Sequence, residues 1–511
     1  MNAEGTIDKK VEDKIHKVNI KQTLLIGFGF LSAMIAWSFY NFKIPIILNG
    51  ITGDIPGEWD RIGILGTAPI MEIFGAFIMV LDNIVAILLQ PYFGRLSDRL
   101  ESKYGRRSPF LILGLPTAAF CFFILPFMSI FGLFIAVILV FNLAMAFYRA
   151  PIISLLPDKT PPQTLSTANS FISLMGGLGF VMGFLIPAMV SLIPGTEPVM
   201  TGHYDTQFFF WQDFMGFFLA ASMMTICLIM FLWKVKEVPT GEKFFHVADR
   251  PIKFDVYTQK VIPYEEGELA KEVKKPGFFD EWREIIKNED KSAFWVLLGI
   301  FAYFFGFNAL EYSFGRFATS YLQISEGFAS ILIAIMPVML IVFAILAGTL
   351  ATKYGRLLIM RLGLLIMAIG LVGVIITVGL LKPVIADHPL TLIDLIPLMA
   401  FLSFGGIGYG FATINALPVV WQLAPREKIG AYTGVYYMIS SLGAITSPLC
   451  MGTIFFIVAS LGGDRWLALF PYFLVAVIIG LYFLMKVEKG DAEPLTNEEL
   501  ARLRAIYASG D

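Results

Sequence analysis

The chain has 511 residues, of which 57% are hydrophobic and 15% charged, and its formal net charge is −2. A soluble globular domain averages about 45–50% apolar and about 25% charged residues, so this composition excludes an ordinary soluble protein. The net charge itself excludes no class, because in a membrane protein the positions of the charges matter more than their sum. The three cysteines all lie in apolar blocks, which favours neither a disulfide framework nor a metal site.

Twelve apolar blocks follow a polar stretch of about 20 residues that does not resemble a cleaved signal peptide, so the first block is expected to be a retained helix. A helix needs about 20 apolar residues to cross the ~30 Å hydrocarbon core of a bilayer. The blocks predict spanning helices near residues 22–46, 70–93, 109–129, 132–155, 166–193, 213–235, 292–320, 326–351, 357–381, 394–421, 430–460 and 466–486.

Lysine and arginine concentrate in the loops on one side of these predicted spans. The main groups fall at residues 9–21, 95–107, 237–291, 353–361 and 426–428. Because cytoplasmic loops carry an excess of Lys and Arg, both termini are predicted to be cytoplasmic, which agrees with an even number of spans. We expect a multi-pass protein of the cell membrane.

One long hydrophilic interior segment divides the spans six and six. A run of apolar residues between 278 and 286 predicts a short interfacial helix there, and Thr496–Ser509 has helical propensity. A solvated linker and tail are favoured over a separate binding domain. The predicted organisation is a cytoplasmic tail (1–21), a six-helix bundle (22–236), a cytoplasmic linker (237–291), a second six-helix bundle (292–486) and a cytoplasmic tail (487–511).

The two halves share a repeated loop. Lys103-Tyr104-Gly105-Arg106 follows the second predicted span, and Lys353-Tyr354-Gly355-Arg356 follows the eighth. Repetition of this kind indicates two bundles in parallel orientation with a substrate cavity between them.

The first of these loops carries a family resemblance. Gly94-x-x-x-Asp98-Arg99 followed by Gly105-Arg106-Arg107 resembles the signature loop of the major facilitator superfamily. The longer segment from Gln90-Pro91 to Pro109-Phe110 resembles the sucrose–proton symporters and their prokaryotic relatives among the glycoside–pentoside–hexuronide cation symporters. The resemblance implies an all-α membrane protein of twelve helices in two bundles that transports a sugar together with a cation.

The same loop is expected to act as a cytoplasmic gate. Asp98 can cap a helix end or pair with Arg99 or Arg106, while Gly94 and Gly105 let the backbone turn and approach a neighbour closely. The alternative is a plain basic loop on the cytoplasmic face. That alternative accounts for the arginines but not for the ordered Gly-Asp-Gly spacing.

The second predicted span carries the deepest carboxylate. Asp82 lies near the middle of this span. Glu72, Asn83 and Gln90 form a polar stripe along the same helix, and Asp82 directly precedes Asn83 without belonging to the stripe. A carboxylate in a partly dry cavity can bind and release a proton near neutral pH, so Asp82 is the first candidate for coupling. The alternative for Asp82 is a structural role as the partner of a buried arginine. The alternative for Glu72 is a position on a solvated face of the helix.

The fourth predicted span carries Asn142 and Arg149, seven residues apart on one face. The planar donor fork of Arg149 suits sugar hydroxyl groups, and it resembles the arginine with which sucrose symporters bind substrate. The alternative is an arginine that extends to the cytoplasmic interface. The sequence departs from the plant symporters at Ile138, where they carry a coupling aspartate, and from the melibiose-type sodium aspartates at Ala86 and Gln90. Any coupling acid must therefore lie elsewhere.

The seventh predicted span adds Asn308, Glu311 and Arg316, for which function and anchoring are both open. Glu311 is a second coupling candidate, and Lys43 is expected to be an interfacial anchor. The predicted substrate contacts are Tyr40, Asn41, Asn83, Asn142, Arg149, Asn308, Arg316 and Asn415.

Other classes of protein are not favoured. The glycine clusters at 176–183 and 405–410 fall inside spans and lack a phosphate-binding Gly-Lys-Ser/Thr end, so they indicate close helix packing rather than ATP binding. An intramembrane enzyme would need a convergent nucleophile–base pair or a set of metal ligands, and it is not favoured because all four histidines lie outside the spans. We expect a monomer in the lipid bilayer with a sugar and a coupling H⁺ or Na⁺, no other cofactor and no nucleic acid. A uniporter or exporter of another solute, and a transporter-derived scaffold or receptor, remain alternatives.

Overall fold

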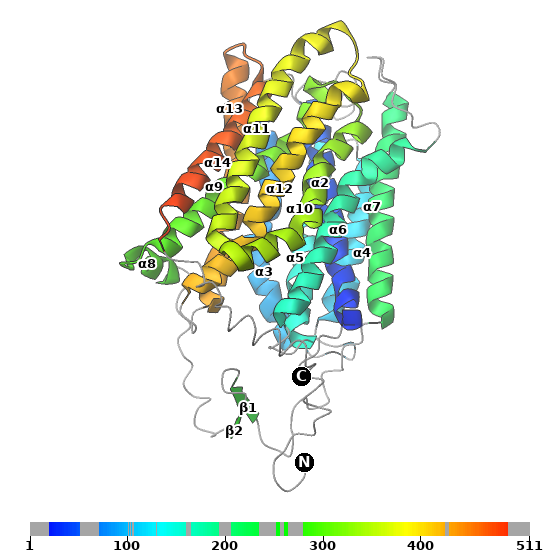
Figure 1. The fold of residues 1–511 in the computed structure, drawn as a ribbon. Coiled ribbons are helices and arrows are strands. Elements are labelled where there is room, and N and C mark those ends of the chain that lie inside the picture. Colours follow the sequence, from blue (N-terminus) through cyan, green and yellow to red (C-terminus); the bar gives the residue numbers. More distant parts are fainter. Residues whose placement is uncertain are drawn as a thin grey trace. The chain divides into compact units, whose positions relative to one another are not determined.

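The computed structural model of the chain is almost entirely α-helical (Figure 1). It describes residues 20–51, 71–100, 102, 104, 107–128, 130–159, 165–193, 206–234, 252–255, 260–263, 280–424 and 429–488. Within these residues, 12 helices are long and apolar enough to cross a membrane. This confirms the predicted all-α membrane fold.

The spanning helices follow the predicted order. Those of the first half are α2 (Ile20–Ile51), α3 (Met71–Arg99), α4 (Ser108–Ile124), α5 (Phe131–Lys159), α6 (Leu165–Ser191) and α7 (Thr206–Lys234). Those of the second half are α9 (Ser292–Arg316), α10 (Glu326–Tyr354), α11 (Arg356–Asp387), α12 (Leu392–Leu423), α13 (Ile429–Ser460) and α14 (Leu469–Met485). Several extend beyond the apolar blocks, because backbone hydrogen bonding continues past the hydrophobic stretch. The helix α3, for instance, continues through Gly94, where we had expected a turn.

Short elements connect the longer ones. A single 3-10 turn, η1 (Leu125–Phe127), separates α4 from α5, and η6 (Arg465–Ala468) leads into α14. A short helix is confirmed at the predicted place as α8 (Asp280–Lys287), in which Ile285 is buried, while its position at a membrane interface stays a prediction. The strands β1 (Ile252–Asp255) and β2 (Lys260–Pro263) pair antiparallel within the linker, and their four-residue length gave too little alternation to predict them. The expected tail helix at Thr496–Ser509 lies outside the described residues.

Contacts divide the chain into two compact units, whose boundary cuts two helices. Unit 1 takes in residues 1–41, 57–64 and 81–275, and unit 2 takes in residues 42–56, 65–80 and 276–511. The boundary falls within α2 and within α3. The predicted extracellular ends of both helices therefore pack with helices of the second half, inside unit 2.

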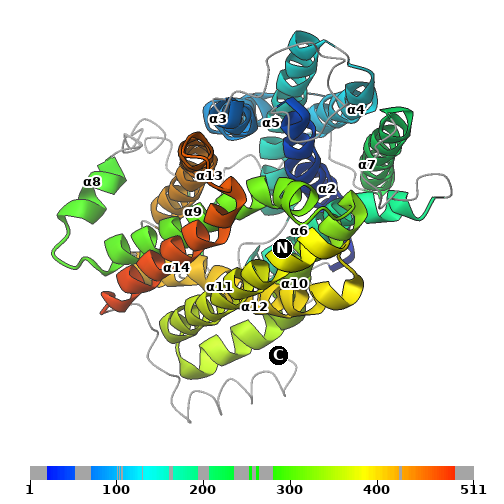
Figure 2. The same ribbon diagram turned by 90° about the horizontal axis from the view of Figure 1, so that it is seen from above.

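Glycines set the closest helix contacts within each unit. In unit 2, α11 and α12 lie side by side (Figure 2), and a Cβ on Gly363 would lie 2.7 Å from the carbonyl oxygen of Gly408. In unit 1, a Cβ on Gly179 of α6 would lie 2.5 Å from the carbonyl oxygen of Leu31 on α2. No larger residue fits at such contacts, which confirms helix packing as the role of Gly408 and Gly179 in the two predicted glycine clusters.

An aromatic core in unit 1 fixes the positions of α2, α4, α5 and α7. Phe39 packs edge-on against Phe122 and Phe217, and Phe122 stacks on Phe141 with ring centroids 4.4 Å apart. Phe141 also stacks on Tyr40, at 5.3 Å. This packing holds the Tyr40 ring between α2 and α5.

Candidate functional site

A polar cluster in unit 1 brings together three of the predicted site residues. The Tyr40 hydroxyl interacts with the Asn142 side chain and lies within electrostatic reach of Asp82. The side chains of Tyr40 and Asn142 are almost fully buried, yet the Tyr40 hydroxyl and both polar atoms of the Asn142 amide complete no hydrogen bond of normal geometry. Burial of polar groups whose hydrogen bonding is incomplete costs about 1–3 kcal/mol each, so this cluster is a candidate site for a polar ligand.

Asp82 itself is only 3% exposed, deep within α3. Its Oδ1 accepts hydrogen bonds from the backbone nitrogen and the side-chain Nδ2 of Asn83, at 2.5 and 2.6 Å. Asn83 was predicted to contact substrate, but here it holds the carboxylate of its neighbour. An ionisable group at this depth is costly unless it serves a function or a fixed partner.

Arg149 lies in the same unit, against an aromatic ring that the sequence analysis did not single out. Its guanidinium carbon is 4.6 Å from the ring centroid of Trp37. Trp37 precedes Tyr40 by three residues and Asn142 precedes Arg149 by seven, so each pair shares one helix face. The α2 face therefore presents Trp37 and Tyr40 to the α5 face that carries Asn142 and Arg149.

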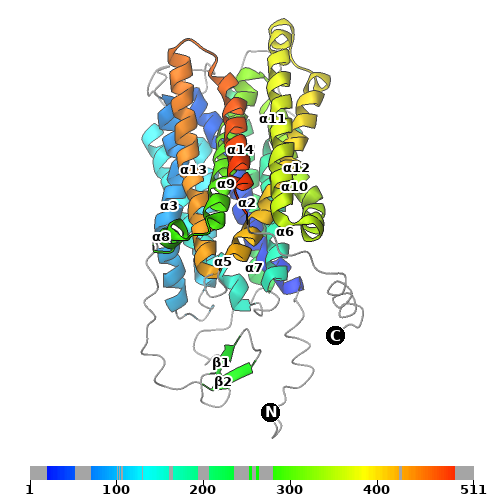
Figure 3. The same ribbon diagram turned by 60° about the vertical axis from the view of Figure 1, so that its left-hand side comes forward.

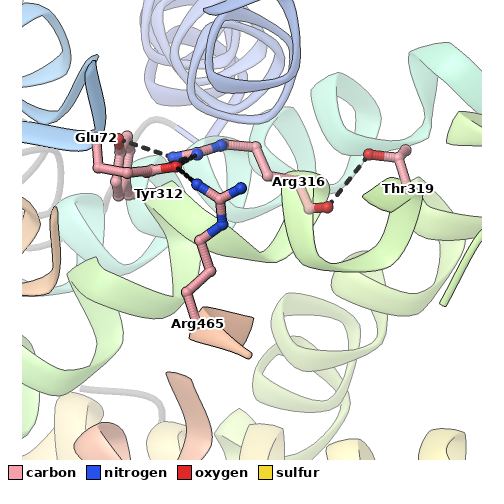
Figure 4. Close-up of polar contacts among 5 residues, drawn as sticks. All are labelled: Glu72, Tyr312, Arg316, Thr319 and Arg465. Atoms are coloured by element: carbon pink, nitrogen blue, oxygen red, sulfur yellow. Dashed lines mark hydrogen bonds and ion pairs between the residues drawn. The ribbon is translucent and has the colours of Figure 1, made fainter. Parts of the chain in front are cut away.

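A buried ion-pair network lies in unit 2, at the predicted extracellular end of α3 (Figure 4). The Glu72 carboxylate accepts from Arg316 Nη2 at 2.7 and 2.8 Å and from Arg465 Nη1 at 2.6 Å. Arg316 also donates to the Tyr312 hydroxyl at 3.1 Å and lies over the Trp466 ring. Glu72 is 1% exposed, so the alternative of a solvated face is wrong for this residue.

The same end of α3 also approaches α13 very closely. A Cβ on Gly452 would lie 2.8 Å from the carbonyl oxygen of Glu72, and Figure 3 shows α13 beside this segment. Glu72 is thus enclosed by α9, η6 and α13. Arg316, predicted as a substrate contact, has its guanidinium committed to this network.

A second buried ion pair joins the end of α2 to α10. Lys43 Nζ lies 2.6 and 2.7 Å from the two carboxylate oxygens of Glu326, and both side chains are less than a tenth exposed. Lys43 was expected to anchor at the membrane interface; instead it is a buried partner. Glu326 is in the first turn of its helix, where the helix dipole favours a negative charge.

The remaining predicted contacts of the second half lie on α9 and α12. Glu311 lies within electrostatic reach of Tyr409. The amide nitrogens of Asn308 and Asn415 donate to the carbonyl oxygens of Phe304 and Phe411 in their own helices. Asn41 is half-buried, and it is the last residue of α2 that belongs to unit 1.

Part of the predicted cytoplasmic gate is described. Arg107, which is buried, donates to Ser97 Oγ and to the carbonyl oxygen of Gly94, and Ser97 Oγ donates to that carbonyl at 2.7 Å. The arginine thus fastens the loop to the end of α3. The side chains of Asp98, Arg99 and Arg106, and all of Gly105, lie outside the described residues.

Sequence reasoning missed Trp37, Arg465 and Glu326 as parts of these clusters. Trp37 could have been found from its position on the same face as Tyr40. Arg465 in η6 and Glu326 in the first turn of α10 lie at the ends of spans rather than deep inside them, so nothing in their local sequence indicated burial. Their partners are hundreds of positions away along the chain, and only the fold brings them together.

Twelve apolar helices with buried charges between them define a multi-pass membrane protein. The family model of the Major Facilitator Superfamily matches residues 26–448 and, in a second match, 317–507. The chain belongs to this superfamily.

Individual relatives are distant. The chain is 26% identical over 216 residues to the sucrose transport protein SUC3 of Arabidopsis thaliana, and this match covers 36% of the chain and 34% of that protein. The aligned region thus spans about a third of the relative. Among solved structures, a D-xylose–proton symporter shares 15% identity with a TM-score of 0.61 over 92% of this chain and 98% of its own. A bacterial Spinster homologue shares 14% identity with a TM-score of 0.62, over 93% and 98%. These structures support the fold alone.

Proposed function

We propose that this transporter moves a sugar, such as a di- or oligosaccharide or a glycoside, together with a proton or a sodium ion. Membership of the superfamily and the partial similarity to a sucrose transport protein support the substrate class. We place it in the cell membrane with both termini in the cytoplasm, because the charged loops favour that orientation.

One observation carries the coupling proposal: a buried carboxylate lies beside buried polar groups that complete no hydrogen bond of normal geometry. Asp82 offers a site for a cation, and Tyr40 and Asn142 offer a hydroxyl and an amide for a sugar hydroxyl group. Because the two sites are within electrostatic reach of each other, occupation of one changes the energy of the other. Such linkage is what symport requires.

The energetics fit a single coupling cation. One elementary charge moving down 100 mV is worth about 2.3 kcal/mol, which supports roughly fiftyfold accumulation of a neutral sugar. No nucleotide is needed for accumulation on this scale. Alternating access, in which the substrate site opens to one side of the membrane at a time, completes the proposed cycle.

The test compares Asp82→Asn with wild type in proteoliposomes. Uptake of radiolabelled sucrose, maltose and lactose is measured with an imposed proton gradient, with a sodium gradient and with neither. We expect Asp82→Asn to abolish uphill uptake while exchange of sugar across the membrane survives. The matched control is Asp387→Asn, which makes the same change at an exposed end of α11.

Two outcomes would overturn parts of the proposal. If uphill uptake and its gradient dependence are unchanged in Asp82→Asn, the coupling role of this residue is wrong. If wild-type uptake responds to neither gradient, the protein is a uniporter or exporter instead.

A further inference from the structure

The predicted cytoplasmic end of α14 carries a lysine in contact with two aromatic rings. The Nζ atom of Lys486 lies 4.6 Å from the ring centroid of Trp295, in the first turn of α9, and 4.5 Å from that of Tyr482. The two helices pack together within unit 2 (Figure 2). Because a cation is attracted to the face of an aromatic ring, these contacts hold the ammonium group at one place on the surface.

Capping of α14 does not account for this lysine. A cation at the C-terminus of a helix commonly binds the last carbonyl oxygens. Here Arg361 of α11 does so, because its Nη2 donates to the carbonyl oxygens of Leu484 and Val487, both at 2.9 Å. Among the residues that the structure describes, no carboxylate forms an ion pair with Lys486, and the neighbouring Glu488 is exposed. The charge of Lys486 therefore has no counter-charge within this part of the chain.

The face of α14 that carries Lys486 is exposed and apolar along its length. Val475, Ile479 and Tyr482 precede the lysine at helical spacing, so the four side chains share one face, and all of them are exposed. This face runs from aliphatic side chains within the span, through an aromatic ring, to a cation at the predicted membrane surface. A phospholipid has matching parts in the same order: acyl chain, ester region and phosphate.

We propose that this face of α14 binds an anionic phospholipid of the cytoplasmic leaflet, with the phosphate at Lys486 and an acyl chain along Val475 and Ile479. The inference goes beyond the proposed function and does not depend on the identity of the transported solute. A negative headgroup supplies the counter-charge that Lys486 lacks. A zwitterionic headgroup such as phosphatidylcholine brings its own ammonium group, which the lysine repels.

The test measures lipid binding to the full-length protein in detergent by native mass spectrometry. Dioleoylphosphatidylglycerol is anionic and dioleoylphosphatidylcholine is zwitterionic with the same acyl chains, so their comparison isolates the headgroup. Lys486→Gln removes the charge and Lys486→Arg retains it. The matched control is Lys382→Gln, which removes an exposed lysine near the predicted extracellular end of α11. Because Lys486 is exposed, neither substitution leaves a buried group unpaired, and both variants are expected to fold.

We expect wild type, Lys486→Arg and Lys382→Gln to bind the first molecule of phosphatidylglycerol about fivefold more tightly than phosphatidylcholine. This factor corresponds to about 1 kcal/mol, the attraction of one lysine to an anionic membrane surface. Lys486→Gln should bind the two lipids with equal affinity. An excess of inorganic phosphate should not displace the lipid from wild type, because phosphate alone cannot use the apolar face.

Three results would overturn this inference. If Lys486→Gln keeps the preference of wild type for phosphatidylglycerol, the anionic lipid is bound elsewhere. If wild type binds the two lipids equally, the headgroup is not recognised and the face is an ordinary lipid-facing surface. If inorganic phosphate displaces phosphatidylglycerol, the site takes a free anion rather than a lipid. None of these results bears on the proposed sugar transport, which is tested separately by uptake.

Discussion

Two kinds of buried polar region occur in this protein, and they differ in whether their polar groups are satisfied. At the predicted extracellular ends of α2 and α3, Glu72 and Lys43 each have charged partners at 2.6–2.8 Å. Nearer mid-span, the Tyr40 hydroxyl and the Asn142 amide are buried and complete no hydrogen bond of normal geometry. The first region is complete without a ligand; the second is not.

We propose that this difference separates groups that hold helices together from groups that bind substrate. Removal of one partner from a saturated ion pair leaves a buried charge and weakens the fold. Removal of a hydroxyl that completes no hydrogen bond of normal geometry leaves little newly unsatisfied, so the stability of the fold should change little and ligand binding should weaken.

The largest effect is expected for Glu72→Gln. The change keeps the shape of the side chain but removes the negative charge that faces Arg316 and Arg465. The buried guanidinium of Arg316 and the partly buried guanidinium of Arg465 then lose this counter-charge, and we expect the free energy of unfolding to fall by about 3–5 kcal/mol. The thermal midpoint in detergent measures it, with Glu289→Gln as an exposed control. A midpoint equal to that of wild type would show that the network contributes no stability.

A smaller loss is expected for Lys43→Met, toward the lower end of about 3–5 kcal/mol. Only one opposite charge is left behind, and Glu326 in the first turn of α10 keeps the favourable field of the helix N-terminus. The double variant Lys43→Met with Glu326→Leu should regain most of the loss, because no charge is then buried alone. Additive losses in this double-mutant cycle would contradict a direct pairing.

The sequence predicted the fold better than the site, for a physical reason. Crossing a bilayer requires a long apolar block, so each of the twelve helices is marked locally in the sequence. A polar contact between helices leaves no such mark. Asp82, Tyr40 and Asn142 stood out because polar residues are rare in spans, and the structure brings them together. Lys43 also stood out, but its partner could be found only in three dimensions.

The smallest effect on stability is expected for Tyr40→Phe, and here the contrast between the two regions is sharpest. The hydroxyl has no partner of normal geometry, so its removal should change the free energy of unfolding by less than about 0.5 kcal/mol or raise it slightly. Sugar affinity, measured in detergent by the thermal stabilisation that sucrose, maltose or lactose gives to the protein, should nevertheless fall about five- to tenfold.

The matched control is Tyr148→Phe, which removes an equally buried hydroxyl that does have a partner, Met145 Sδ at 3.2 Å. That control should lose stability and keep its affinity. If Tyr40→Phe instead behaves like Tyr148→Phe, the polar cluster of unit 1 is part of the scaffold, and the distinction between satisfied and unsatisfied regions does not identify the substrate site.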